Sequence, residues 1–474
     1  LNGQDLEIFW VLPFVGILLS IAIFPLVAEH FWHHNFGKIS LFWAMLLIVP
    51  LLFFSAQTDS VGEVIGPTGL QITLYEVLHV GLLEYVPFLI LLLSLYTISG
   101  GVQLKGSLVG TPTLNTLIIF IGTVLASWMG TTGAAMLLIR PLIRANQHRK
   151  NKVHIIVFFI FLVANIGGSL TPLGDPPLFL GFLKGVNFFW TTSAMFLPML
   201  FMAISLLIIF FGVDTYFYKK EPPYDNILVD DEKLGLEGSF NLLLLAGVVG
   251  GVLFSGFGKV LFEYEIDGET LVKHINIYHV HVEYQNIIRD IILLGLTYAS
   301  WTFTPKSIRE ANEYTWFPIE EVGKLFAGIF VTIIPAIAIL KAGTKGALSS
   351  IVSLVSVPGS NEPINYMYFW LTGILSSFLD NAPTYLVFFN TAGGDPTTLM
   401  KEEPEGMFTT LLAISAGAVF MGANSYIGNA PNFMVKAIAE SSNIKMPSFF
   451  GYIIKWSLPF LIPLFAIVTW IFFL

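Results

Sequence analysis

Long apolar stretches recur along the chain, with short polar segments between them. A helix of roughly 17–25 apolar residues crosses about 30 Å of hydrocarbon. We therefore predict membrane-spanning helices wherever such a stretch runs without a break. These stretches are 6–28, 39–56, 77–99, 190–212, 240–262, 286–301, 322–340 and 447–473. The first one lacks the basic start and small-residue cleavage site of a signal peptide, so we interpret it as a spanning helix.

Four further apolar stretches are interrupted by glycine, proline, asparagine and aspartate. They cover residues 113–146, 153–187, 363–394 and 408–440. Non-helical backbone at membrane depth is stable only where protein or a water-filled cavity surrounds it. Interrupted segments at corresponding places in two halves of a chain indicate the binding site of a transporter.

The interruptions correspond in spacing. Residues 126–133 match 376–383, and the match is displaced by 250 residues. Residues 174–177, which read Gly-Asp-Pro-Pro, match 428–431, which read Gly-Asn-Ala-Pro, with a displacement of 254. We interpret the chain as an internal duplication, because the displacement barely changes between the two pairs.

Lysine and arginine predict the orientation, since they concentrate on the inner side of a membrane. We place the N-terminus outside and let 113–146 and 363–394 enter and leave on one side. The inner segments then carry 14 basic residues and the outer segments 6. This topology predicts inverted repeats at 1–212 and 239–474, joined by a linker at 213–238, and such repeats suit alternating access.

An extramembrane β-hairpin-like insert is predicted at about 262–284, where polar and apolar residues alternate around Asp267-Gly268. The insert carries His274, His279 and His281. A metal site is one interpretation of them. Ordinary alternation along a strand, with His279 and His281 on one face, is the simpler one.

Composition excludes several classes of protein. Only 12% of the 474 residues are charged, about half of the roughly 25% that is usual in soluble domains. The formal net charge of −9 argues against a nucleic-acid partner. The chain has no cysteine, which excludes disulfides, thiolate metal sites and cysteine nucleophiles. We find no nucleophile–base pair, HExxH motif or phosphate loop, so we expect a transporter rather than an enzyme, with no cofactor.

Two of the interrupted motifs resemble a known superfamily. Residues 164–177 (Ala-Asn-Ile-Gly-Gly-Ser-Leu-Thr-Pro-Leu-Gly-Asp-Pro-Pro) and 424–432 (Asn-Ser-Tyr-Ile-Gly-Asn-Ala-Pro-Asn) are similar to the unwound-helix motifs of the ion transporter superfamily. That superfamily includes divalent-anion/sodium symporters, citrate transporters and NhaD-type sodium/proton antiporters. The resemblance implies an all-α polytopic membrane protein, in which each inverted repeat has a re-entrant helical hairpin and a broken transmembrane helix. It also implies a homodimer with a scaffold part and a moving part, and a bacterial inner membrane is our default expectation.

The chain departs from the carboxylate symporters at the hairpin tips. Those symporters carry Ser-Asn-Thr at each tip, whereas residues 130–132 here read Gly-Thr-Thr and residues 380–382 read Asp-Asn-Ala. Asp175 also stands where they usually have an uncharged residue. Two acids repel a di- or trianion by several kcal/mol at short range in low dielectric. They attract a hard cation, which prefers oxygen ligands, so we predict a Na⁺ site at Asp175, Asp380 and Asn381.

Burial then predicts the transport mode. A buried aspartate binds either a proton or Na⁺, so the two ions compete for it, and antiport follows when the site changes sides. We expect further ligands and flexible glycines at the four interruptions. The ligands are Asn165, Thr131, Thr132, Thr171, Asn424, Ser425, Asn429 and Asn432; the glycines are Gly130, Gly133, Gly167, Gly168, Gly174, Gly422 and Gly428.

Several alternatives remain open from the sequence. Asp175 and Asp380 each precede a possible helix start and suit an N-cap as well as a binding role. Glu84 and His79 suit either a proton relay or a structural pair. At the level of the whole protein, the alternatives to a Na⁺/H⁺ antiporter are a cation-coupled citrate or dicarboxylate symporter and a non-transporting membrane subunit.

Overall fold

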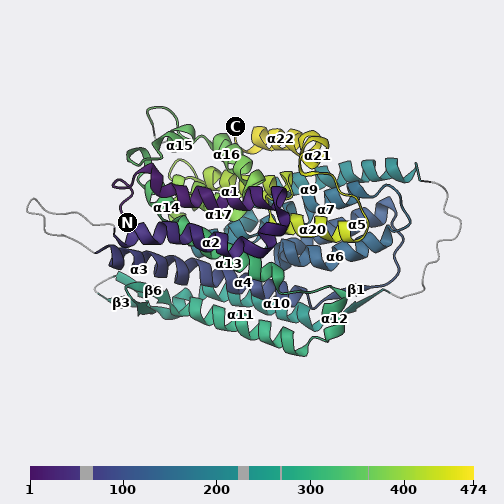
Figure 1. The fold of residues 1–474 in the computed structure, drawn as a ribbon, viewed down its shortest axis with the longest axis horizontal. Coiled ribbons are helices and arrows are strands. Elements are labelled where there is room, and N and C mark those ends of the chain that lie inside the picture. Colours follow the sequence, from purple (N-terminus) through teal and green to yellow (C-terminus); the bar gives the residue numbers. More distant parts are fainter. Residues whose placement is uncertain (54–67, 222–233, 267–268, 361) are drawn as a thin grey trace, which may run out of the picture.

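Apolar helices form most of the molecule and lie roughly along its longest axis (Figure 1). The structure is a computed structural model that describes residues 1–53, 68–221, 234–266, 269–360 and 362–474. By length and composition, 8 helices among these residues can cross a membrane. They are Ile8–Val27, His30–Leu52, Gly69–Ser99, Pro112–Met129, Val153–Leu170, Phe188–Tyr218, Phe240–Phe262 and Phe449–Phe472. The prediction of a mostly helical, multi-pass membrane protein is confirmed.

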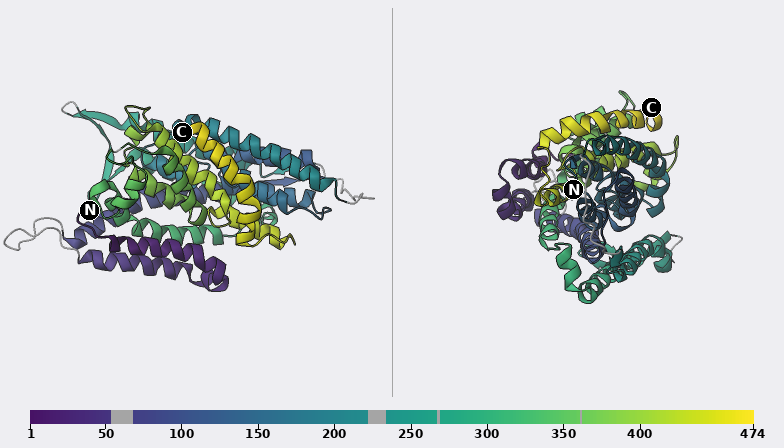
Figure 2. Two further views of the ribbon diagram at one scale, coloured as in Figure 1. Left: turned by 90° about the horizontal axis from the view of Figure 1, so that it is seen from above. Right: turned by 90° about the vertical axis from the view of Figure 1, so that its right-hand side faces the viewer.

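One set of helices, the first helix group, packs along one side of the molecule (Figures 1 and 2). Its core is apolar, and the ring of Phe88 on α4 contacts those of Phe326 and Phe330 on α13, in tilted and edge-on arrangements. The members are α1 (Leu12–Val27), α2 (Glu29–Leu52), α3 (Gly69–Val80), α4 (Val86–Ser99), α10 (Phe240–Phe257), α11 (Tyr284–Phe303) and α13 (Phe317–Thr332).

The second helix group contains all four interrupted segments. Two pairs of helices each meet at a sharp break: α5 (Pro112–Met129) with α6 (Thr131–Ala145), and α16 (Asn365–Phe378) with α17 (Asn381–Thr391). Two other segments break into short helices joined by irregular backbone. These are α7 (Val153–Leu162), η3 (Ile166–Leu170) and α8 (Pro176–Leu183), and likewise α19 (Phe408–Met421), η6 (Gly422–Asn424) and α20 (Ala430–Ser441).

The remaining elements connect or flank these groups. Among them α9 (Phe188–Tyr218) and α22 (Ile462–Phe472) pack on the second group. The shorter helices are η1 (Ile8–Val11), η2 (Gly81–Tyr85), η4 (Gly258–Phe262), α12 (Lys306–Ala311), α14 (Ile334–Lys341), η5 (Gly343–Lys345), α15 (Ser349–Leu354), α18 (Pro396–Met400), α21 (Phe449–Tyr452) and η7 (Ile453–Leu461). The strands are β1 (Gln103–Lys105), β2 (Gly235–Glu237), β3 (Glu263–Ile266), β4 (Glu269–Val272), β5 (His274–Ile277) and β6 (Val280–Glu283).

Two helices extend into segments that the sequence predicts to be loops. Helix α2 begins at Glu29, after a single non-helical residue, although 29–38 was expected to lie outside the membrane helices. A tertiary contact supports this polar start, because Trp32 Nε1 donates to Glu321 on α13 at 3.1 Å. Helix α9 continues six residues beyond Gly212 to Tyr218, into the predicted linker. Part of that linker, 222–233, lies outside the described residues, as do 54–56 of the second predicted span.

The predicted span at 322–340 is two helices rather than one. Helices α13 and α14 are bent by 41° at Ile333. Pro335 stands in the first turn of α14, where a proline is favoured, and it cannot continue the hydrogen-bond ladder of α13.

The predicted insert consists of two antiparallel hairpins, β3–β4 and β5–β6. The proposed turn at Asp267-Gly268 lies outside the described residues. The second hairpin turns at Tyr278 and His279, both of which have positive φ, so His279 lies in the turn and not on a strand face with His281. His274 Nε2 and His281 Nδ1 are 2.5 Å apart. Among the described residues, no group of three histidine or acidic side chains is arranged to hold a metal.

Each broken helix folds so that two of its glycines touch. A Cβ on Gly174 would lie 2.1 Å from the carbonyl oxygen of Gly168. In the other half, a Cβ on Gly428 would lie 2.5 Å from the carbonyl oxygen of Gly422. Real Cβ atoms do not approach backbone this closely, so both turns require glycine.

A charged cluster is buried at the far end of the second group. Asp214 Oδ1 accepts from Arg149 Nη2 at 2.5 Å and lies 2.8 Å from His154 Nε2, and its Oδ2 accepts from Asn115 at 2.9 Å. Asn146 links Asn115 to Arg149. The sequence places Arg149 and Asp214 in solvent-facing segments, and that expectation is wrong for both, because the two side chains are buried and form an ion pair in the interior.

We expect Gly174→Ala to destabilise the protein by about 1–3 kcal/mol, because the new methyl group collides with a rigid carbonyl. The measurement is thermal unfolding in detergent. The matched control is Gly250→Ala on α10, where nothing lies within 4 Å of the new Cβ, and there we expect no loss of stability. Equal unfolding temperatures for the two variants would contradict the packing argument.

We expect Asp214→Asn to cost about 3–5 kcal/mol of unfolding free energy, since it leaves a buried guanidinium without its counter-charge. The same melting assay applies. Glu440→Gln is the control, because it breaks a solvent-exposed ion pair with Lys436 on α20 and should change stability by about 0.5 kcal/mol or less.

Candidate functional site

The four interruptions meet at the carboxylate of Asp175. Its Oδ2 accepts from Asn381 Nδ2 at 2.6 Å, and its Oδ1 accepts from Asn429 Nδ2 at 2.9 Å. Thr131 Oγ1 donates to Oδ1 at 3.4 Å. Each partner comes from a different interruption, and all four side chains are buried. The carboxylate thus joins the starts of α6, α8, α17 and α20.

These four residues form two pairs, and the separation within each pair equals the displacement between the two halves of the sequence. Asn429 follows Asp175 by 254 residues, and Asn381 follows Thr131 by 250. An acid and an amide therefore occupy equivalent positions at the ends of the two broken helices. A hydroxyl and an amide occupy equivalent positions at the ends of the two helix pairs. The acid is the one charged member of this quartet.

Matching serines hold the interruptions together in both halves. The Thr171 hydroxyl donates to the Ser127 carbonyl oxygen and accepts from the Leu173 N–H at 3.2 Å. In the same way the Ser425 hydroxyl donates to the Ser377 carbonyl oxygen at 2.5 Å and accepts from the Ile427 N–H at 3.2 Å. The two halves therefore build equivalent local structures where the broken helices cross the helix pairs.

Ser127 and Ser377 were not among the residues predicted from the sequence to be functional. Each also donates a hydrogen bond from its hydroxyl, Ser127 to Gly167 and Ser377 to Met421. A sequence signal for them exists, since both lie at the same place in the matched stretches 126–133 and 376–383.

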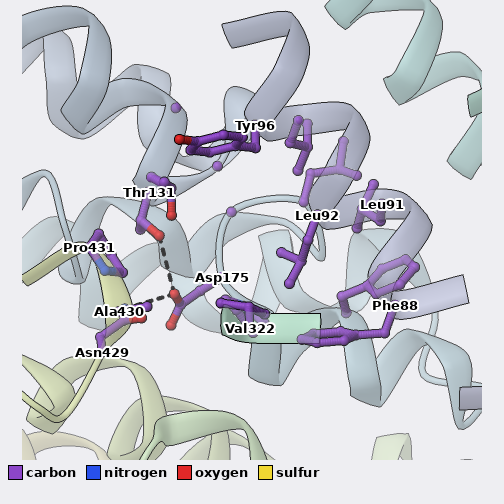
Figure 3. A pocket seen from close by; sticks show the side chains of 18 of the residues that line it. Phe88, Leu91, Leu92, Tyr96, Thr131, Asp175, Val322, Asn429, Ala430 and Pro431 are labelled. Carbon is purple, nitrogen blue, oxygen red and sulfur yellow. Dashed lines mark hydrogen bonds between the residues drawn. The ribbon is translucent and has the colours of Figure 1, made fainter. Parts of the chain in front are cut away.

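Asp175 also borders a cavity at the boundary between the two helix groups. Figure 3 shows its carboxylate between Thr131 and Asn429, with Leu92, Phe88 and Val322 on the opposite side. Gly130, Thr132, Gly133 and Asp380 complete the polar side of this cavity, and α4 and α13 supply the apolar side. Among the described residues, no lysine or arginine lines it.

Asp380 lies beside the same cavity and also caps a helix. Its Oδ1 accepts from the Ala382 N–H at 3.0 Å, which caps the N-terminus of α17. It also lines a neighbouring cavity whose other walls include Glu321, Trp32 and Tyr426. The capping interpretation and the proposed ion-binding role are compatible, because the cap uses one carboxylate oxygen.

Two further predicted residues form the next layer around Asp175. Asn429 Nδ2 approaches Asn165 Oδ1 at 3.4 Å, and Asn165 Nδ2 donates to Asn432 Oδ1 at 2.7 Å. Asn432 in turn donates to the carbonyl oxygens of Gly422 and Ser425, both at 2.9 Å. These buried amides orient Asn429 and tie the two broken helices to each other.

Other predicted ligands are engaged away from the carboxylate. The hydroxyls of Thr171 and Ser425 are used by backbone groups, as described above. Asn424 Nδ2 donates to Ser377 Oγ at 2.9 Å. These three side chains support the broken backbone, and the geometry gathers Thr131, Asp175, Asn381 and Asn429 at the centre instead.

The centre has an unused acceptor. Asn381 Oδ1 is buried and has no hydrogen-bond partner among the described residues. A buried acceptor left unpaired costs free energy, and here it belongs to the amide that contacts Asp175. Carboxylate, amide and hydroxyl oxygens from Asp175, Asn381 and Thr131 are a donor set for a hard cation.

Glu84 and His79 lie away from this centre. Glu84, on the π-helical turn η2, forms an ion pair with Lys184 at the end of α8 and is 4% exposed. The pair links the first helix group to the second. His79 is half-buried one helical turn before Glu84, and the structure shows no hydrogen bond between the two.

A comparison with protein families supplies the classification. The family model described as "Putative citrate transport" matches residues 3–473. The match covers nearly the whole chain, so the chain belongs to this family, which is part of the citrate transporter and ion transporter superfamily. A search of curated proteins found no match. Family and apolar helices together make the chain a multi-pass membrane protein of a transporter family.

The pairing within this quartet allows the proposed cation site to be tested. We expect Na⁺ to stabilise the detergent-solubilised protein and so raise its unfolding temperature. The gain in unfolding free energy should be about 2.7 kcal/mol when Na⁺ is at 100 times its Kd. Asp175→Asn should abolish that stabilisation. The double variant Asp175→Asn, Asn429→Asp should restore part of it, because the carboxylate returns at the equivalent position.

The measurement is a melting curve in NaCl against choline chloride at equal ionic strength. The control is Asp175→Asn with Asn424→Asp, which returns a carboxylate outside the quartet and should restore nothing. Equal rescue by both double variants would show that position within the quartet does not matter.

Proposed function

We propose that this member of the family is a secondary active transporter that exchanges Na⁺ for H⁺. The observation that carries the proposal is the environment of Asp175. It is buried, its three side-chain partners are neutral, and no basic residue in the described part of the chain lines the adjacent cavity. A carboxylate shielded from water and without a cationic partner is stable only when it binds a proton or a metal cation.

Competition between Na⁺ and H⁺ for the Asp175 carboxylate then produces exchange of the two ions. When Na⁺ binds, it coordinates the Asp175 carboxylate and the free oxygen of Asn381, and the proton leaves to the water that reaches the site. When Na⁺ leaves, a proton takes its place. If only the two occupied, neutral forms change sides, each cycle exchanges one ion for the other. Asp380, on the same cavity, is the proposed second acid.

The position of the site suits alternating access. Asp175 belongs to the second helix group, whereas α4 and α13 of the first group form the opposite wall. We propose that the second group moves relative to the first, and that the two halves are inverted repeats whose helix pairs are re-entrant hairpins. The equivalent contacts of Ser127 and Ser377 support this duplication.

The structure also suggests which side the site faces. The cavities that border Asp380 are walled by Pro318, Ile319 and Glu321 on α13 and by Trp32 on α2. In the orientation predicted from lysine and arginine, these residues lie near the inner face. We infer an inward-open arrangement. We further propose that the protein lies in a bacterial inner membrane as a homodimer.

A citrate or dicarboxylate symporter coupled to cations is the second candidate. Two observations favour it: the description of the family and the starts of four helices at one point, since helix N-termini attract anions. However, Asp175 and Asp380 stand in the N-cap positions of α8 and α17, where they offset that attraction. An anionic substrate would have to arrive with its cations, for example as a metal–citrate complex.

We expect purified protein in liposomes to dissipate an imposed pH gradient when Na⁺ is added, and citrate alone to have no effect. Asp175→Asn should lower the exchange rate at least 100-fold, because the amide cannot take up a proton. Asp380→Asn should lower it at least 10-fold if this acid also binds ions. The measurement is the fluorescence of a pH-sensitive dye trapped in the vesicles.

The control is Asp395→Asn, which alters an exposed N-cap of α18. Asp395 does not line the cavities beside Asp175 and Asp380, so this change should leave exchange unchanged. Uptake of labelled citrate, without any pH response to Na⁺ alone, would replace antiport by the second candidate. Full exchange activity in Asp175→Asn would refute the role of the quartet.

A further inference from the structure

A second cavity, of about 450 Å³, lies away from Asp175. It is enclosed by the turn between α8 and α9, the ends of α4 and α10, and the start of α11 beside β6. Leu82, Leu83, Phe182 and Phe257 form its apolar wall, and Lys259, Glu283, Gln285 and Arg289 form its polar wall. A cavity of this size accommodates a small organic ligand.

Two buried side chains of the polar wall have unused hydrogen-bonding atoms. Arg289 and Gln285 are both 1% exposed. Arg289 Nε donates to Asp290 at 2.8 Å and its Nη1 to Asn286 at 3.2 Å, but Nη2 has no partner among the described residues. Gln285 Nε2 donates to Glu283 at 2.6 Å, and its Oε1 likewise has none. Both residues belong to the cavity wall, and each has one hydrogen-bonding atom that no other described residue uses.

The charges of the wall indicate what kind of ligand fits. Lys259 and Arg289 are basic, and Glu283 and Asp290 are acidic, so these four charges balance. His281 also lines the cavity and adds no charge when its imidazole is neutral. A di- or trianion would meet both acids, which makes it a poor ligand. A zwitterion suits the wall, with its anionic group on Arg289 and Lys259 and its N–H donors on Gln285 and Glu283.

The location of the cavity indicates that the ligand also has an apolar part. The cavity lies where the apolar helix Phe240–Phe262 ends and near the strands β3–β6, at the end of the molecule that carries the N-terminus (Figure 1). Lipid head groups lie at the level where spanning helices end. The leucines and phenylalanines of the wall provide contacts for hydrocarbon next to the polar groups.

We propose that this cavity binds a phosphoethanolamine head group, with its phosphate on Arg289 and Lys259 and its ammonium on Gln285 and Glu283. The head group comes either from a membrane phospholipid or from a soluble phosphodiester. The site is separate from Asp175 and independent of which ion the protein carries. It places a ligand next to the Glu84–Lys184 ion pair, since Leu83 and Leu183 on the wall adjoin these two residues in sequence.

The test is calorimetric titration of the delipidated full-length protein with dihexanoyl phosphatidylethanolamine. We expect one molecule to bind per chain. Arg289→Gln and Gln285→Met should each weaken binding at least 10-fold, and Leu183→Trp, which fills the cavity, should abolish it. Arg140→Gln is the matched control, because that arginine pairs with Glu313 away from the cavity and its loss should leave the affinity unchanged.

Three further probes discriminate the chemistry. Dihexanoyl phosphatidylcholine has no N–H donor, so it should bind at least 5-fold more weakly. Glycerophosphoethanolamine tests the source: equal affinity means a soluble ligand, and weaker binding means a membrane lipid. The proposal fails if phosphatidylethanolamine does not bind, if it binds the Gln285→Met and Leu183→Trp variants as it binds the unaltered protein, if phosphatidylcholine binds equally well, or if citrate binds more tightly.

Discussion

The need to pair polar backbone inside an apolar bundle is the constraint on which this structure depends. Four segments stop being helical in the interior, and each stop leaves N–H and carbonyl groups without helical partners. Ser127 and Thr171 in one half, and Ser377 and Ser425 in the other, supply hydrogen bonds across the breaks. Gly174 and Gly428 let the chain turn closely enough for those bonds to form. Once these contacts exist, the starts of four helices must face one another.

The meeting of these four helix starts forms the candidate binding site from residue types that are common in proteins. Threonine, asparagine and aspartate are common caps, and Asp380 does cap its helix. What distinguishes Asp175 is that its acceptors are filled by side chains from three other breaks, all neutral. Both matched pairs differ between the halves, but only one pair contains an acid: Asn429 stands in one half where Asp175 stands in the other. A site with a single central charge can be neutralised by one proton or one monovalent cation, which is why exchange is the function that we favour within this transporter family.

The two cavities differ in the charged residues that line them. Around Asp175 the described lining residues include acids and no base, and this is why we propose a cation as the ligand. Around Arg289 the acids and bases are balanced, but one donor and one acceptor are left free, which selects for a ligand that carries both signs. Between these cavities, the Glu84–Lys184 pair connects the two helix groups. Elsewhere, as at Arg149 and Asp214, buried charge is paired and has a structural role.

The sequence by itself determined the membrane-spanning class, the positions of the four interruptions and the two candidate acids, because hydrophobic length and the matched spacing are local properties. Only the structure placed Asp175, and not Asp380, at the centre of the contacts. The sequence predicted the ends of helices less well. Near the start of α2, Trp32 donates to the distant Glu321, and near the end of α9, Asp214 accepts from the distant Arg149. These contacts allow both helices to extend into polar segments. Of the predicted ligands, only the tertiary structure separated Thr131, Asn381 and Asn429, which contact Asp175, from Thr171 and Ser425, which bond to backbone. It alone revealed the free atoms of Gln285 and Arg289, because whether a buried polar atom has a partner depends on residues that come together only in the folded chain.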